Sequence, residues 1–351
     1  MRLRYFLVIF IVLAVPSGAA TLMEPGSRST QDGLRWMKDY RENPSPQAVP
    51  KLYKTLSKRG AFREPDSSGV YIGFLAGVIG SNPRTARSLI AKTLPLPFED
   101  QWIIIRAVAY SGHPRWRELM LYLIDQLPDR RLLTEHYLSG RLPTLDEVPL
   151  DTKRMTPMEK FRRIFKRETY FGKKKKKEEP VTFATHPELI DIHWGLYFAT
   201  GKAQPIARVV ELLPWTKERD DVDKLTIGGM AKFTLAANAS RDVHLLRLLK
   251  SLSREQPKEI RPILQDVTEA AETADTARIR KDVLAVVDEL RRKGPGSKRE
   301  IAWWGKVGQT ALSLGCVGAA VTGQVEFGVP CVVGGALSSA ALRYLASPED
   351  G

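Results

Sequence analysis

The chain has 351 residues, of which 43% are hydrophobic, 8% aromatic and 27% charged, and its formal net charge is +14. This composition is ordinary for a folded protein and excludes a wholly disordered chain. The length allows a sizeable core, either in one elongated domain or in two compact ones.

The first twenty residues have the pattern of a secretory signal. Arg2 and Arg4 give a positively charged start, residues 5–15 are apolar, and residues 16–20 supply small side chains for cleavage after Ala19 or Ala20. We therefore predict an exported protein, periplasmic or secreted, with a charge of +12 after removal of the two arginines. An uncleaved anchor is the alternative, although the apolar stretch is shorter than a full membrane span.

Helical repeats are predicted over residues 21–140 and 183–293. In each copy an apolar run ends in a small-residue turn, and a second, amphipathic run follows. Proline suits the first turn of a helix, and an Asn or Ser before it can cap that helix. The clearest copies are residues 71–80 before Asn82-Pro83, residues 102–112 before His113-Pro114, and residues 193–201 before Gln204-Pro205; fainter copies precede Asn43-Pro44 and residues 240–242.

The amphipathic runs keep helical spacing, and the turns recur at a regular interval. From Pro83 to Pro114 is 31 residues, and from Pro114 to Pro205 is 91, close to three such steps. Fixed spacing of helix pairs is typical of an α-solenoid. The turns at Asn82-Pro83, His113-Pro114 and Gln204-Pro205 resemble those of the HEAT and tetratricopeptide repeat class, over residues 30–290 with gaps. This resemblance implies an all-α fold with a concave surface for a protein partner; an irregular all-α domain is the alternative.

A basic segment at residues 141–182 interrupts the repeats. Its four prolines break regular structure, a short amphipathic helix is predicted over residues 156–166, and five consecutive lysines follow. An apolar-anchored helix beside a cationic tract suits an anionic lipid or polysaccharide surface, and export makes nucleic acid a poorer partner. A solvated insert without a ligand is the alternative. The predicted anionic-surface residues are Arg162, Arg163, Lys166, Arg167, Lys173, Lys174, Lys175, Lys176 and Lys177.

Residues 294–351 are predicted to form a hinge and a Gly/Ala-rich apolar helical hairpin. Cys316 and Cys331 are the only two cysteines, and they lie symmetrically about a turn at residues 323–324. An oxidising compartment favours a disulfide between them, which would staple a hairpin that caps or docks on the repeats. A membrane-inserted hairpin, with Trp303, Trp304 and Tyr344 as interface anchors, is a second interpretation, but its basic ends would face outward, against the positive-inside tendency. Reduced, buried cysteines are a third.

Catalytic and metal-binding motifs are absent from the sequence. There is no zinc-type Cys/His cluster, no phosphate-binding glycine loop followed by Lys-Ser/Thr, and no G-x-S-x-G motif. We therefore predict no cofactor, no metal and no catalytic residue, and interpret the chain as a scaffold or binding module at the cell envelope. The alternatives are a membrane-anchored envelope protein and an enzyme with His136 or His193 in a helical groove. A pocket that holds a histidine against a carboxylate would favour the enzyme.

Overall fold

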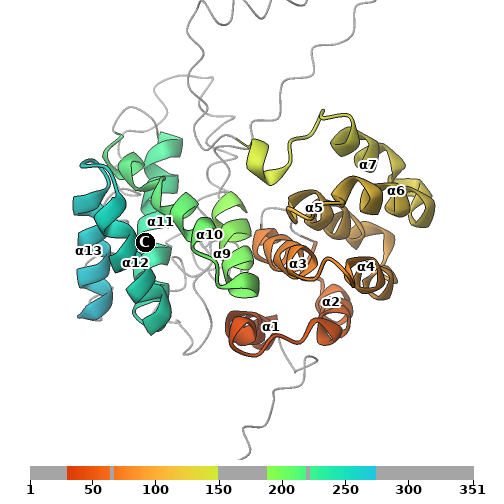
Figure 1. Ribbon diagram of the computed structural model, residues 1–351, viewed down its shortest axis with the longest axis horizontal. Coiled ribbons are helices and arrows are strands. Elements are labelled where there is room, and N and C mark those ends of the chain that lie inside the picture. The colour runs from red at the N-terminus through yellow and green to blue at the C-terminus, as the bar shows by residue number, and fades with distance from the viewer. Residues whose placement is uncertain (1–29, 64–66, 149–187, 219–221, 274–351) are drawn as a thin grey trace, which may run out of the picture.

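The computed structural model describes residues 30–63, 67–148, 188–218 and 222–273, and within these residues it is all-helical, with twelve α-helices and no strand (Figure 1). The predicted all-α class is therefore confirmed. The predicted signal segment, the basic residues between Arg162 and Lys177, both cysteines and the predicted C-terminal hairpin lie outside the described residues.

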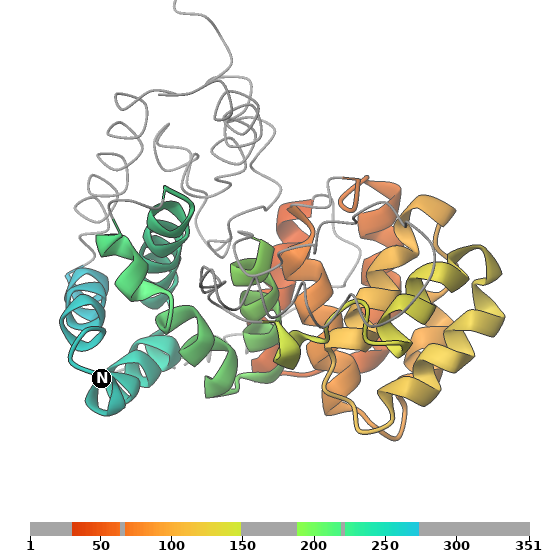
Figure 2. The same cartoon turned by 90° about the horizontal axis from the view of Figure 1, so that it is seen from above.

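Two groups of helices flank a central pair. In Figures 1 and 2 the helices of the first half and those of the second half lie on opposite sides, and α3 and α9 meet between them. The first half comprises α1 (Thr30–Asp39), α2 (Val49–Lys58), α3 (Gly69–Ser81), α4 (Ala86–Thr93), α5 (Trp102–Tyr110), α6 (Trp116–Gln126), α7 (Arg131–Leu138) and the short 3-10 helix η6 (Leu145–Glu147). The second half comprises α9 (Glu188–Thr200), α10 (Ala203–Val210), the 3-10 helix η8 (Leu213–Lys217), α11 (Val222–Ala239), α12 (Val243–Glu255) and α13 (Arg261–Glu272).

Helices are present on both sides of the predicted turns, but the turns are built differently from the expectation. Helix α4 begins at Ala86, three residues after Pro83, and no side chain caps it. The Asn82 amide instead donates to the Val78 carbonyl oxygen at 2.8 Å, so it satisfies a C-terminal carbonyl of α3. The fainter copy at residues 240–242 does end in a true N-cap, because the Asp242 carboxylate accepts a hydrogen bond from the Leu245 N–H at 3.0 Å.

Helices α3 and α9 form the centre of the fold because neither has a polar face. Every residue of α3 from Gly69 to Ile79 is buried, and most of α9 is buried too. A Cβ built on Gly73 would fall 1.9 Å from the Ile192 carbonyl oxygen, and one on Gly195 would fall 2.1 Å from the Val70 carbonyl oxygen. The two backbones are thus in direct contact, which only glycine at these positions permits.

The outer helices are amphipathic and turn one apolar face inward. The predicted i, i+3, i+4 spacing in α10 is confirmed, since Ile206, Val209 and Val210 are fully buried. Helix α6 likewise buries Met120 and Leu123, while its other face meets solvent. Their burial supplies the hydrophobic free energy that holds the outer layer to the central pair.

Two ion pairs tie the halves together at buried positions. The Arg106 guanidinium of α5 donates to both carboxylate oxygens of Glu188 at the start of α9, at 2.7 and 3.0 Å. Burial by itself would lower the Arg106 pKa, but the Glu188 carboxylate raises it above the usual value. Arg41 similarly donates to Asp242 and lies over the Tyr197 ring. Both pairs join segments distant in sequence.

Among the helices that the structure describes, none combines the length and the apolar character that a membrane crossing requires.

Candidate functional site

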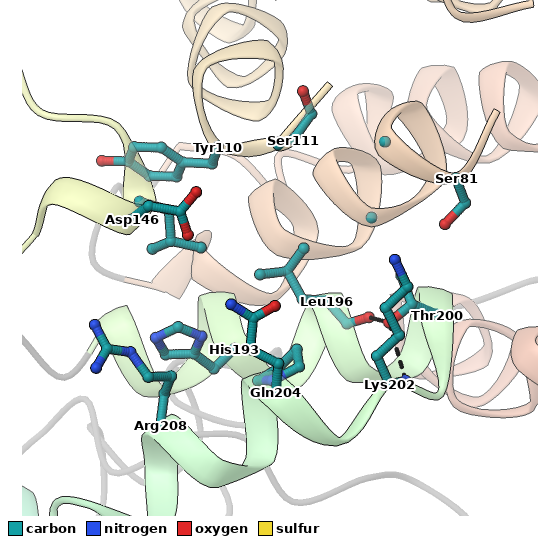
Figure 3. A pocket seen from close by; sticks show the side chains of 15 residues that line it. Ser81, Tyr110, Ser111, Asp146, His193, Leu196, Thr200, Lys202, Gln204 and Arg208 are labelled. Carbon is teal, nitrogen blue, oxygen red and sulfur yellow. Dashed lines mark hydrogen bonds between the residues drawn. The ribbon is translucent and has the colours of Figure 1, made fainter. Parts of the chain in front are cut away.

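A polar cavity of about 280 Å³ lies between the two halves of the fold, where α3, α5, η6, α9 and α10 meet (Figure 3). Its walls are the C-terminal turns of α3 and α5, the C-terminal half of α9, the turn into α10, and η6. Three of the lining residues are apolar and larger than glycine, namely Leu145, Leu196 and Pro205. The cavity therefore offers mainly hydrogen-bonding and charged groups.

Glycines create the space for this cavity. Gly77 and Gly80 place no side chain in the cavity from the last turns of α3, and Gly112 ends the turn after α5 with a φ of 59°. Gly80 lies against the neighbouring turn, because a Cβ on it would fall 2.1 Å from the Ser111 carbonyl oxygen. The ends of α3 and α5 thus form one continuous wall made largely of backbone.

His193 is a buried polar residue of the cavity with an unpartnered ring nitrogen. Its side chain projects from α9, the residue is 5% exposed, and its Nδ1 atom is buried with no hydrogen-bond partner. Burial and, to a smaller extent, the nearby positive charge of Arg208 lower the pKa of His193 to about 4. The imidazole is therefore neutral at physiological pH, with one nitrogen able to donate and the other to accept a hydrogen bond.

The charged groups of the cavity lie at two ends. In Figure 3, Arg208 of α10 and Asp146 of η6 lie on the side of His193, and Lys202 lies with Thr200 on the other side, with Leu196 between. The Arg208 guanidinium also donates to Glu211 at 2.9 Å, which holds it against the exposed side of α10.

A capping box fixes the loop that carries Asp146. The Thr144 N–H and hydroxyl both donate to the Glu147 carboxylate, at 2.8 and 2.9 Å. These hydrogen bonds lower the pKa of Glu147, because they stabilise its charged form. The box thereby orders η6 at the rim of the cavity.

The start of α10 forms the opposite rim. Lys202 is the N-cap of this helix, and its side chain makes no capping hydrogen bond. Its backbone N–H donates to Thr200 Oγ1 at 3.2 Å, which fixes the turn between α9 and α10. The first N–H groups of a helix lack partners within the helix and carry a partial positive charge, so this rim is electropositive.

Comparison with family models, curated proteins and solved structures gives no match. The interpretation of the site therefore depends on its own geometry.

Two arrangements that would indicate catalysis or metal binding are missing from the described residues. His193 and Asp146 line the same cavity, yet no hydrogen bond joins them. In the same part of the chain, no three His, Cys, Asp or Glu side chains gather in a way that would hold a metal ion. A histidine base without an orienting partner is poorly prepared for proton transfer.

The histidines named from the sequence have different environments. His193 lines the cavity, whereas His136 lies on α7 away from it and is partly exposed. His113 is structural: its Nδ1 accepts from the Arg115 N–H at 3.0 Å, and its Nε2 lies 3.3 Å from the Pro83 carbonyl oxygen, which links two turns. The predicted surface residues, the disulfide and the anchors Trp303, Trp304 and Tyr344 lie outside the described residues.

Sequence reasoning missed most of the cavity. The sequence did not indicate that Tyr110, Asp146 and Arg208 line a common cavity, because they come from three separate elements. One signal was available, because the Gln204-Pro205 turn follows His193 closely and carries Lys202 and Arg208 on either side. That turn was interpreted as a repeat boundary rather than as the wall of a site.

Proposed function

We propose that this protein is a non-catalytic helical binding module whose ligand is a small polar molecule held in the cavity beside His193. The observation that carries the proposal is the buried, unpartnered Nδ1 of His193. A buried polar atom without a hydrogen bond costs about 1–3 kcal/mol. A ligand that supplies this hydrogen bond recovers that free energy, so the cavity is prepared for one.

The size and lining of the cavity define the scale of the ligand. A volume of about 280 Å³ is just below the range of about 300–1,000 Å³ that is usual for drug-sized ligands. The site therefore suits a metabolite-sized molecule rather than a peptide or a polymer. The scarcity of apolar lining residues favours a ligand with several polar groups, because apolar surface placed there would leave polar groups without partners.

Catalysis is the second candidate, because a histidine and a carboxylate line one cavity. Two features favour binding instead. The pKa of His193 is lowered to about 4, whereas an efficient general base at neutral pH has a pKa near 7. Asp146 is exposed and makes no hydrogen bond with the imidazole, so nothing orients the ring for proton transfer.

The wider setting of the site remains part of the proposal. The helix pairs support a solenoid-like arrangement, and its concave surface would carry a protein partner. The proposal also includes export to the periplasm or the exterior. The basic insert would contact an anionic surface, and the C-terminal hairpin would cap, dock or anchor the protein in a membrane. In this proposal, the protein binds a small solute at the cell envelope.

A cavity-filling variant tests the proposal. Gln204 lines the cavity and is exposed at its rim, so Gln204→Trp should fill the mouth without entering the core. Gln126→Trp, at the exposed end of α6, is the matched control. A library of small polar metabolites would be screened against the full chain by ligand-observed NMR.

We expect ligands that bind the wild type and the Gln126→Trp variant but not the Gln204→Trp variant. Binding that the Gln204→Trp change leaves intact would place the ligand elsewhere. Chemical conversion of a bound ligand, lost on His193→Gln, would establish the enzyme in place of the binder.

A further inference from the structure

Positive charge predominates among the groups that line the cavity. Lys202 and Arg208 are cationic, His193 is neutral, and Asp146 is the one carboxylate among the lining residues, all of which are described. The electropositive start of α10 lies at the same rim. A net positive site recruits and retains an anion.

Arg208 and His193 together form a place for an oxyanion. The guanidinium carries five N–H donors in a planar fork, and in this structure one of its amino groups donates to Glu211. Figure 3 shows the guanidinium beside the imidazole, and His193 has no partner at Nδ1. An oxyanion between them would accept hydrogen bonds from both, and a charge-assisted bond from arginine is among the stronger kinds.

The remaining lining groups suit hydroxyls. The Ser111 hydroxyl donates to the Val108 carbonyl oxygen and accepts from the His113 N–H. The Thr200 hydroxyl donates to the Leu196 carbonyl oxygen and accepts from the Lys202 N–H, so each oxygen keeps one lone pair for a further hydrogen bond. The Asp146 carboxylate accepts only. These acceptors match ligand groups that donate hydrogen bonds. Hydroxyls are such donors, and because they are uncharged the Lys202 ammonium does not repel them.

We infer that the cavity takes a small organic anion that bears hydroxyl groups, with its carboxylate or phosphate between Arg208 and His193 and its hydroxyls toward Asp146 and the serine and threonine side chains. This inference rests on the proposed function and names the class of its ligand. Carboxylate and phosphate share the chemistry of an oxyanion, and the probes below separate them.

Three related compounds test the inference on the full chain. Glycerate and glycerol 3-phosphate carry a carboxylate or a phosphate on similar hydroxylated skeletons, and glycerol is the neutral counterpart of both. Affinity would be measured by isothermal titration calorimetry at low salt. The ¹⁵N signals of the His193 imidazole would report contact at the site. We expect at least one anion to bind about tenfold or more tightly than glycerol, because a hydrogen bond to a charged group is worth about 1.5–3 kcal/mol.

Two variants locate the anion. Arg208→Met should weaken binding of that anion about tenfold, by removing the guanidinium that contacts it. Lys202→Met should weaken binding measurably but less, because Lys202 lies at the other end of the cavity and attracts the anion only through its charge. Lys92→Met removes an exposed lysine of α4, away from the cavity, and should not change the affinity. Lys202 is exposed, so its replacement does not disturb the core. The Lys202 variant therefore still tests the inference if the Arg208 variant folds poorly.

The possible results separate this inference from the proposed function. Glycerol that binds as tightly as both anions, or a screen that yields neutral ligands alone, overturns the anion inference and leaves the binding module standing. Anion binding that neither variant weakens overturns it too, because the anion then lies elsewhere. A screen in which no small molecule binds removes the proposed function, and the inference falls with it.

Discussion

Gly73 lies so close to Ile192 that a methyl group on its Cα would fall 1.9 Å from the isoleucine carbonyl oxygen. The obstacle is backbone, which cannot rotate away as the end of a side chain can. Gly69 and Gly77, one turn to either side, make similar approaches to Glu188 and Ala199. The contact between α3 and α9 therefore depends on three glycines at four-residue intervals.

The first prediction concerns this contact. Gly73→Ala should lower the free energy of unfolding by about 3 kcal/mol or more, because the added methyl group forces the two central helices apart. Urea denaturation followed by circular dichroism measures this change. Gly33→Ala in α1 is the control: its Cβ would meet the flexible end of Leu56 at 3.2 Å, and alanine favours a helix by about 1 kcal/mol over glycine. Equal stability of the two variants would contradict the close packing of α3 and α9.

The second prediction concerns the buried ion pair between Arg106 and Glu188. Arg106→Met should lower the free energy of unfolding by about 3–5 kcal/mol, because the Glu188 carboxylate is left buried without its partner. Replacing both residues by methionine should cost much less than the two single changes added together. A double-mutant cycle in urea measures the coupling, with the exposed Arg131–Glu135 pair of α7 as a control whose coupling should be much weaker. Additive single effects would show that the pair is not coupled.

The third prediction separates the two tasks of Asp242. Its Oδ1 caps α12 by accepting from the Leu245 N–H, and its Oδ2 accepts from Arg41. Asp242→Asn keeps a capping oxygen but loses the charge, whereas Asp242→Ala loses both. We expect the asparagine variant to be destabilised and the alanine variant to be less stable still, by about 1 kcal/mol, as measured by thermal unfolding. Identical melting temperatures for the two variants would mean that the cap contributes nothing.

The fourth prediction is a dependence of stability on pH that comes from His193. Its pKa is about 4 in the folded protein, below the ordinary value of 6.5 that applies after unfolding. Between these two pH values the unfolded chain binds the proton and the folded chain does not, so stability falls as the pH is lowered. This group contributes its full stabilisation above pH 6.5 and loses up to about 3 kcal/mol by pH 4.

His193→Gln removes the titrating ring and should flatten the dependence over this window. Urea denaturation at a series of pH values compares the two slopes, and carboxylate titration, common to both proteins, cancels in the difference. Parallel curves for wild type and the His193 variant would show that the imidazole is already able to protonate in the folded state.

Local sequence patterns predicted the helices well because apolar spacing is a property of one segment. The periodicity of Ile206, Val209 and Val210 identified the buried face of α10, and their side chains are fully buried. Proline was a poorer guide to boundaries: Pro83 precedes α4 by three residues, and the Asn82 amide serves the preceding helix. A polar residue between two helices can hydrogen-bond the end of the first helix or the start of the second. Its position in the sequence does not show which of the two it does.

The central contact and the cavity required long-range information. The four-residue glycine spacing of α3 is visible in the sequence at Gly69, Gly73 and Gly77. Which helix lies against those glycines depends on tertiary packing. The cavity brings Asp146 from one half of the chain to Arg208 in the other, and no pattern within a single segment predicts that meeting.

The absence of a polar face on α3 has a consequence for the order of events during synthesis. Helix α3 leaves the ribosome well before α9, the helix that covers its glycine side. Until α9 arrives, the most apolar segment of the described chain has one flank open, and such transiently exposed surface promotes aggregation. A nascent chain halted between η6 and α9 would therefore be a natural client for a chaperone, and completion of α9 would release it.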